Sequence, residues 1–424
     1  MTRALEISIE KNGEQIRVGR ITGTSPQDAS FEYLPEYIAA ANRPISISLP
    51  LQEAPFTPDI TRNFFEGLLP EGFARRSVSE WLHANEDDYL RILQALGREC
   101  LGAIQVSSPG ETRGGYEPLS VEDVKALARE GMRRSTDLVV QAHLSLTGAS
   151  GKAGLYYDQV DDQWFLPKGI APSTHIVKQS HVRLGGIVTN EQISMTAAKA
   201  LGLDVPESFI VNTGEGRDED ILFATRRYDR VFSECSEMTD GLPRPLRLHQ
   251  EDFAQALGIS SREKYERPGQ EYLKKIFEML RSYSVEPIND QLKLWDTLVF
   301  DYLIGNTDNH IKNLSVVYSP DMRTIRLAPA YDIVSTCIYR ESSRQMAIGI
   351  GGEFDIDRIT RKQFEIASEE AGLGRRMAMG RFDRMADRFE STLKEIALAL
   401  SEMGLQETNA ICDKILRSGG YALL

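Results

Sequence analysis

An aspartate and an asparagine with a short spacing stand out in the last third of the chain. Asp308 and Asn313 are five residues apart in IGNTDNHIKNLS (304–315), and Asp332 follows 19 residues after Asn313. Carboxylate and amide oxygens hold hard cations such as Mg²⁺, and a carboxylate close to a hydroxyl can accept its proton. A five-residue spacing within one loop turns both side chains toward a common point. These residues could therefore bind a metal and activate a nucleophile.

The order of these residues is typical of phosphoryl-transfer enzymes. In protein kinases a catalytic-loop Asp accepts the substrate hydroxyl proton, an Asn five residues later binds magnesium, and a second Asp beyond a hairpin binds magnesium that bridges the phosphates. LSVVYS (314–319) and TIRLAP (324–329) flank an Asp-Met turn and predict that hairpin. Asp308 is therefore the candidate base, and Asn313 and Asp332 are candidate magnesium ligands. Alone, D-x-x-x-x-N is also a common loop-capping pattern.

A strand lysine followed by a helix acid lies upstream, in the order that kinases use to hold ATP phosphates. Lys178 ends the apolar stretch STHIVK, and Glu191 comes thirteen residues later, in the first turn of a predicted helix. The structural alternatives are a strand-end lysine with a solvated head and an acid that complements a helix dipole. The two residues support each other as a phosphate-binding pair.

A glycine-rich run, SLTGASGKAGL (145–155), precedes these residues. Glycine backbones let amide groups approach phosphate oxygens, although the spacing is not that of a Walker A motif. The candidate ATP contacts in this loop are Gly148, Ala149, Ser150, Gly151 and Lys152.

The elements that must position these residues follow a mixed pattern. The first hundred residues predict a small α+β unit. Its elements are a hairpin around Asn12-Gly13, a strand at 45–49, a helical run at 64–76 interrupted by Pro70 and Gly72, and a strand at 101–106. The Gly-, Ser- and Pro-rich segment 107–120 is the best linker in the chain.

Helix and strand signals alternate from 121 to about 240, with a helix at 121–132 and several short β-rich runs. A capping box of Thr189 and Gln192 starts a helix over about 190–201, and Gly202 ends it. From about 250 the pattern is mostly helical. Apolar residues at steps of three and four from Phe382 to Leu400 predict an amphipathic core helix.

These motifs together resemble the HipA family of serine/threonine kinase toxins from bacterial type II toxin–antitoxin systems. The resemblance runs nearly end to end and keeps the family's order. It rests on FFEGLLPEG (64–72), SLTGASGKAGL (145–155), PKGIAPSTHIVK (167–178), NE (190–191), LGLDVPES (201–208), RRYDR (226–230), HQEDF (249–253), IGNTDNHIKNLS (304–315) and LAPAYDIVS (327–335).

The resemblance implies an α+β, protein-kinase-like bilobal fold with a small N-terminal subdomain and a mostly helical C-terminal lobe. The corresponding domain bounds are 1–110, 121–245 and 246–424. It implies ATP and Mg²⁺ as cofactors, with Asp308 as base, Asn313 and Asp332 as metal ligands, and Lys178 on the phosphates.

The resemblance also assigns roles to residues outside that set. The backbone near Arg226 and Tyr228 would meet adenine, and Ser145 matches the serine at which such kinases phosphorylate themselves in trans. The family often has A-Q-E-K at 149–152, so Ser150 is a second hydroxyl that competes with Ser145. Within the catalytic loop, Lys312 could stabilise the transferring phosphate and His310 could hold the loop.

The 424 residues include 49 basic and 62 acidic ones, a formal net charge of −13. This charge argues against a surface devoted to nucleic acid or anionic membrane, and it suits a basic partner. The resemblance implies such a partner, a small DNA-binding helix-turn-helix antitoxin of the HipB type. The four cysteines are scattered, the N-terminus lacks a signal-peptide pattern, and no apolar run could span a bilayer. We therefore expect a cytoplasmic protein.

Three functions remain open at the sequence level. The first is a toxin kinase that phosphorylates itself and a cellular protein, for which a tRNA synthetase is one possible substrate. The second is a small-molecule kinase of the same fold, since the motifs describe ATP handling and not the acceptor. The third is a non-catalytic corepressor subunit, which the joint presence of Asp308, Asn313, Asp332 and Lys178 disfavours. A metal hydrolase is weaker still, because the histidines show no ligand spacing.

Overall fold

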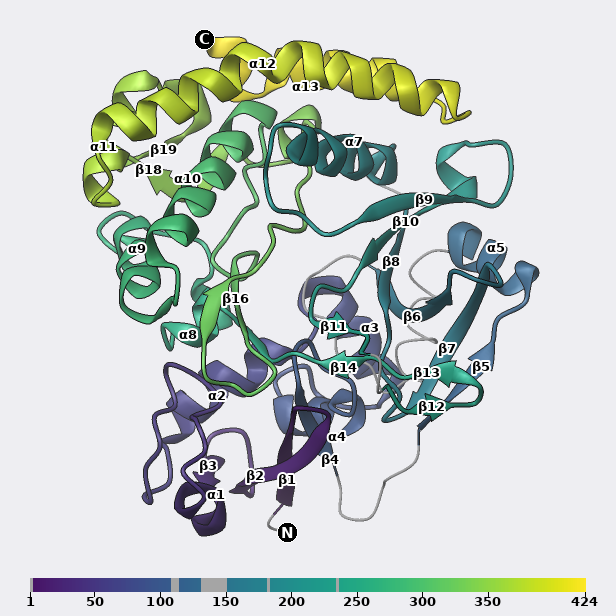
Figure 1. Ribbon diagram of the computed structural model, residues 1–424, viewed down its shortest axis with the longest axis vertical. Coiled ribbons are helices and arrows are strands. Elements are labelled where there is room, and N and C mark those ends of the chain that lie inside the picture. Colours follow the sequence, from purple (N-terminus) through teal and green to yellow (C-terminus); the bar gives the residue numbers. More distant parts are fainter. Residues whose placement is uncertain (1–2, 108–113, 131–150, 181–183, 234–235) are drawn as a thin grey trace. The chain divides into compact units, whose positions relative to one another are not determined.

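The computed structural model describes residues 3–107, 114–130, 151–180, 184–233 and 236–424. The chain forms two compact units (Figure 1). Unit 1 comprises residues 1–179, 224–261 and 317–324, and unit 2 comprises residues 180–223, 262–316 and 325–424. The domain bounds 1–110, 121–245 and 246–424 follow other criteria and stay a prediction.

Unit 1 begins with a four-stranded antiparallel sheet in the order β3-β2-β1-β4. Its strands are β1 (Arg3–Lys11), β2 (Glu14–Gly23), β3 (Ser30–Tyr33) and β4 (Ile104–Ser107). The predicted turn at Asn12-Gly13 is confirmed, because β1 pairs with β2 and both turn residues have positive φ. Alternating apolar residues of β1, such as Leu5, Ile7 and Ile9, are buried.

The helices of this region are α1 (Pro35–Ala39), α2 (Pro58–Phe65), α3 (Gly72–Trp81) and α4 (Tyr89–Leu96). The interruption predicted at Pro70 and Gly72 is confirmed, since α2 ends before them and α3 begins at Gly72. The strand predicted at 45–49 is wrong. This segment is a turn closed by one bridge between Ser46 and Leu49, and its polar groups bond to side chains elsewhere in unit 1.

A second sheet of unit 1 has the order β5-β7-β6-β8-β10. Its strands are β5 (Gly114–Pro118), β6 (Lys152–Asp158), β7 (Gln163–Gly169), β8 (His175–Gln179) and β10 (Ile221–Arg226), whose second half belongs to this unit. The linker predicted at 107–120 is therefore wrong for 114–118. Tyr116 of β5 packs against Tyr156 of β6, which gives this glycine-containing segment a buried anchor.

The remaining elements in the described part of unit 1 are short. They are α5 (Val121–Glu130), β11 (Arg230–Val231), β12 (Met238–Thr239), β13 (Leu242–Pro243), β14 (Leu246–Arg247), β15 (Gln250–Asp252) and α8 (Phe253–Ala256). The helix predicted at 121–132 is confirmed over 121–130 by α5, and residues 131–132 lie outside the described residues.

Unit 2 is mostly helical, and its longest helix, α12, packs against α7, α10, α11 and α13 (Figure 1). The helices are α7 (Ile187–Ala200), α9 (Tyr272–Tyr283), α10 (Pro287–Ile304), α11 (Arg361–Glu370), α12 (Arg375–Glu402) and α13 (Thr408–Ser418). The strands are β9 (Ser208–Asn212), β16 (Ser315–Tyr318), whose first half belongs to this unit, β17 (Ile325–Leu327), β18 (Gln345–Ile350) and β19 (Glu353–Asp355). The predicted apolar stripe of α12 and the predicted hairpin of β16 and β17 are both confirmed.

Helix α7 begins three residues before its predicted start. Its N-cap is Gly186, without a side-chain cap, and Thr189 and Gln192 lie inside the helix. The predicted capping box is therefore wrong, while Gly202, with φ of 97°, follows the helix end as predicted. No helix among the described residues is long and apolar enough to cross a membrane.

Candidate active site

The loop that carries Asp308 begins where α10 ends. Gly305, with φ of 77°, caps this helix. A side chain there would collide with the backbone of Gly419 and with Cys337, so only glycine fits the turn. The chain then changes direction and exposes Asp308, while Asn309 and His310 stay buried.

Asp301, a buried acid on α10, is hydrogen-bonded to this loop. The carboxylate of Asp301 accepts a hydrogen bond of 2.8 Å from Asn306 Nδ2 and a second one from Asn309 Nδ2. Asn306 Oδ1 in turn accepts a bond of 3.3 Å from the backbone N–H of Asp308. Burial raises the pKa of Asp301 to about 7, although both amides favour its ionised form. Asp301 thus fixes the loop on either side of Asp308.

The other side of the loop is bound to the segment around β18. The backbone N–H and the hydroxyl of Thr307 both contact Thr336 Oγ1 at 2.8 Å, and the Thr307 hydroxyl also donates to the Ser343 carbonyl. The Thr307 carbonyl accepts a bond of 3.0 Å from Ala347 N–H. The residue before Asp308 is therefore bonded through its backbone and its side chain.

Asp308 itself contacts three residues of the candidate site. Tyr265 Oη donates a hydrogen bond of 2.6 Å to its Oδ1, and its carbonyl accepts bonds from His310 N–H (2.8 Å) and Asn313 Nδ2 (3.1 Å). The Tyr265 ring meets the His310 ring edge to face at 5.2 Å. The predicted pair Asp308 and Asn313 is thus brought together.

Asp332 lies on a segment that is hydrogen-bonded to the end of the same loop. The neighbouring Tyr331 hydroxyl contacts Ser315 Oγ at 2.6 Å and donates to the Lys312 carbonyl at 3.0 Å. Asp332 has φ of 58°, a left-handed conformation that costs energy for most residues but is better tolerated by Asp. Lys312 and His310 are both buried.

The donor atoms fit a magnesium ion that substrate phosphates help to hold. Asn313 uses its Nδ2 on the Asp308 carbonyl, which leaves its amide oxygen for a cation. Asp332 supplies a carboxylate. Among the described residues no group of three or more His, Cys, Asp or Glu side chains could form a metal cage of its own. Mg²⁺ typically binds through one or two carboxylates, water and substrate phosphates, so this donor set is suited to it.

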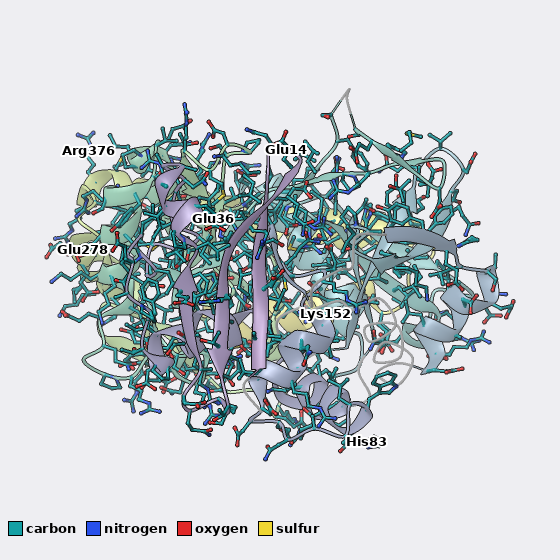
Figure 2. All side chains as sticks on the ribbon, turned by 90° about the horizontal axis from the view of Figure 1, so that it is seen from below. Glu14, Glu36, His83, Lys152, Glu278 and Arg376 are labelled. Carbon is teal, nitrogen blue, oxygen red and sulfur yellow. The ribbon has the colours of Figure 1, made fainter. Side chains whose placement is uncertain are left out.

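Two candidate phosphate-binding lysines lie opposite each other on neighbouring strands of unit 1. Lys152 begins β6, as labelled in Figure 2, and it is the direct antiparallel partner of Lys178 on β8. Opposite residues of an antiparallel pair point to the same face with Cβ atoms about 5 Å apart. Lys178 is only 9% exposed. This arrangement concentrates positive charge on one face of the sheet, where it can attract phosphate oxygens.

The other candidate residues have varied surroundings. Arg226 is exposed at the end of β10, while the Tyr228 hydroxyl donates to Gln250 Oε1. Glu191 is buried in the second turn of α7, not in its first turn as predicted. Gly151 is buried next to Lys152. The candidates Ser145, Gly148, Ala149 and Ser150 lie outside the described residues.

Several residues of this site were missed at the sequence level. They are Tyr265, Asp301, Asn306, Asn309 and Tyr331. Asp301 gave a usable signal, because it is a charged residue within the apolar run LVFDYLI. Tyr265 gave none, since it is 43 residues from Asp308.

The chain is similar to known proteins over nearly its whole length. The family model for the HipA-like C-terminal domain matches residues 144–393, and the model for the HipA N-terminal domain matches residues 12–107. The chain is 32% identical over 395 residues to the putative kinase Y4mE of Sinorhizobium fredii, covering 91% of this chain and 90% of that protein. It is 26% identical to the serine/threonine-protein kinase toxin HipA of Shewanella oneidensis, covering 97% and 94%.

A solved structure has the same fold. It is the complex of the toxin–antitoxin proteins HipA and HipB of Shewanella oneidensis with operator DNA. The similarity covers 98% of this chain and 97% of the solved chain, with a TM-score of 0.75 and 24% identity. The predicted α+β, protein-kinase-like fold is thereby confirmed.

Proposed function

Because the chain belongs to the HipA family and is a serine/threonine-protein kinase, we propose that it is the Mg²⁺-dependent kinase toxin of a type II toxin–antitoxin pair. Its partner is a small DNA-binding antitoxin like the HipB protein named in the solved complex. The proposed products are a phosphorylated cellular protein, whose identity stays open, and the self-phosphorylated chain. The self-phosphorylated residue is Ser145 or Ser150.

One observation carries this proposal. Asp308 and Asn313 are joined by a hydrogen bond, and the segment of Asp332 is bonded to the same loop through Tyr331. In the proposed reaction Asp308 accepts the proton of the acceptor hydroxyl as that oxygen attacks the γ-phosphate of ATP. Asn313 and Asp332 would hold Mg²⁺, which would neutralise charge on the phosphates when bound. Lys152 and Lys178 bind phosphate oxygens, and ADP leaves.

The test is phosphate transfer by the purified full chain with Mg²⁺ and labelled ATP, after intact mass has excluded a pre-existing phosphate. We expect wild type to label itself and Asp308→Asn to be slower by about 10²–10⁴-fold, the usual contribution of a general base. Since Asp308 is exposed, the melting temperature should stay unchanged.

Asp387→Asn is the matched control, because Asp387 is an exposed aspartate of α12 outside the site. It should label at the wild-type rate. An unphosphorylated wild type that takes up no label, or an Asp308→Asn protein as fast as wild type, would count against the proposal. Transfer to metabolites in place of proteins would favour the small-molecule kinase.

A further inference from the structure

Tyr265 lies at the surface of unit 2 and contacts the candidate base. It is 46% exposed, yet its hydroxyl donates to Asp308 Oδ1 at 2.6 Å. Its ring is held by the edge-to-face contact with His310, and the Lys264 ammonium lies 5.2 Å from the ring centre. This surface tyrosine is therefore contacted both at its hydroxyl and on its ring.

One residue of β18 sets the distance between Tyr265 and Asp308. Ala347 N–H donates to the carbonyl of Thr307, the residue before Asp308, at 3.0 Å. The Ala347 carbonyl accepts from the N–H of Glu266, the residue after Tyr265, at 2.9 Å. The backbones on both sides of the contact are therefore bonded to the same residue, through its N–H and its carbonyl.

A second set of bonds fixes the same tyrosine. The Glu266 carboxylate accepts from Gly349 N–H of β18 and from Tyr272 N–H of α9, each at 2.8 Å. Tyr265 thus directly precedes a residue that is anchored through both its backbone and its side chain. The contact between Tyr265 and Asp308 is therefore supported by the hydrogen-bonded framework of unit 2.

We propose that Tyr265 is a positioning residue that fixes the carboxylate of Asp308 for proton transfer, an inference that rests on the proposed function. An ionised carboxylate has about four acceptor sites on two oxygens. Tyr265 occupies one of these sites on Oδ1, and the carboxylate has further acceptor sites with which to take the proton of the acceptor hydroxyl. Without the Tyr265 hydroxyl the carboxylate loses a contact that orients it toward the acceptor, and a small misplacement can cost about 10²-fold in rate.

The contrasting reading is that the tyrosine hydroxyl takes the place of the acceptor hydroxyl and blocks it. The two readings predict opposite kinetics. A positioning tyrosine raises kcat, so its removal slows turnover. A blocking tyrosine competes with the acceptor, so its removal lowers KM for the acceptor or raises the rate. The double anchoring through Ala347 and Glu266 favours positioning, because a blocking group must move away in every cycle.

The experiment uses the full chain as enzyme and a size-tagged Asp308→Asn copy as acceptor, with labelled ATP and Mg²⁺. Varying the tagged copy separates kcat from KM. We expect Tyr265→Phe to lower kcat by about 10- to 100-fold, with KM for the acceptor and the affinity for a fluorescent ATP analogue unchanged. The phenyl ring keeps its contact with His310, so the melting temperature should match wild type.

Tyr283→Phe is the matched control, because Tyr283 is 52% exposed on α9 of the same unit. It should leave kcat and KM at wild-type values. An unchanged or increased kcat of Tyr265→Phe, or a change confined to KM, would overturn the positioning role while the proposed function stands. No transfer by wild type would instead reject the proposed function, and the role of Tyr265 with it.

Discussion

At the scale of single residues, the paired lysines of unit 1 make ATP binding measurable without turnover. Lys152 and Lys178 face each other across β6 and β8, and like charges at such positions repel. A polyphosphate bound between them offsets that repulsion. We expect ATP to raise the melting temperature of wild type, since a ligand at 100 times its Kd adds about 2.7 kcal/mol to the free energy of unfolding. Lys178→Met should lose most of this increase.

The control for this measurement is Lys168→Met. Lys168 lies on β7 of the same sheet, where it pairs with Glu117 at the surface. It should keep the full shift with ATP. An equal ATP shift in wild type and Lys178→Met would remove Lys178 from the phosphate site.

A second residue-scale prediction concerns pH. Burial raises the pKa of Glu251 to about 7, although Ser46, Tyr318 and the Ile47 N–H donate hydrogen bonds that favour its ionised form. In the unfolded chain its pKa is about 4.3. Its contribution to the free energy of unfolding is therefore fully present below about pH 4.3 and is lost as pH rises through 7, in total about 4 kcal/mol.

Glu251→Gln keeps the shape and removes this titration. Between pH 5 and pH 8 its free energy of unfolding should fall by about 2 kcal/mol less than that of wild type. Urea unfolding followed by circular dichroism at both pH values measures the difference. Glu278→Gln, which changes an exposed glutamate of α9, is the control and should follow wild type. Parallel curves for wild type and Glu251→Gln would show that Glu251 titrates normally.

Some residues of the candidate site could be predicted from the sequence, and others could not. Asp308, Asn313 and Asp332 were predicted because phosphoryl transfer needs a base and oxygen ligands at a known spacing. Their roles stay a prediction, although the geometry is compatible with them. Tyr265 acts through a contact across 43 residues, and Ala347 acts through its backbone alone. Neither kind of contact leaves a pattern in one sequence.

At the scale of elements, a buried ionic cluster joins the N-terminal region to the second sheet within unit 1. Glu99 follows α4, and its carboxylate accepts bonds of 2.5–3.0 Å from Arg227, Arg230 and Arg247, all three buried. The arginine charges hold the pKa of Glu99 well below its usual value despite burial. Removing one partner of a buried ion pair costs about 3–5 kcal/mol because the remaining charges are uncompensated.

We therefore expect Glu99→Gln to lower the free energy of unfolding by about 3–5 kcal/mol, measured as a lower urea midpoint. Glu117→Gln removes an exposed glutamate whose pair with Lys168 is at the surface, so it should cost at most about 1 kcal/mol. Similar urea midpoints for both variants would show that the buried ion pairs of Glu99 contribute little to the free energy of unfolding.

Element boundaries were predicted well where local signals dominate and poorly where distant contacts decide. The Asn12-Gly13 hairpin and the stripe of α12 follow from local periodicity. The segment 45–49 has strand-like alternation, but it is a buried turn because Glu251 accepts bonds from Ser46 and from the Ile47 N–H. The segment 114–118 looks like a linker and yet pairs with β7. Both outcomes depend on partners far along the chain.

At the scale of the whole molecule, the net charge predicts that DNA binding is a task of the proposed antitoxin and not of this chain. The chain has 49 basic and 62 acidic residues and a formal net charge of −13. Affinity for DNA comes largely from cationic side chains that neutralise phosphates, and a strongly acidic protein is repelled by them. The toxin should therefore reach operator DNA only through the basic surface of its antitoxin.

A gel-shift experiment with labelled operator DNA at about 150 mM salt tests this division. We expect the chain alone to leave the duplex unshifted at concentrations up to about 10 µM, within the range of non-specific binding by basic proteins. The antitoxin alone should shift the duplex, and added chain should then produce a slower complex. A scrambled duplex is the control and should stay unshifted throughout. Retention of the operator by the chain alone at or below about 1 µM would contradict the prediction, because a local basic surface would then outweigh the net charge of −13.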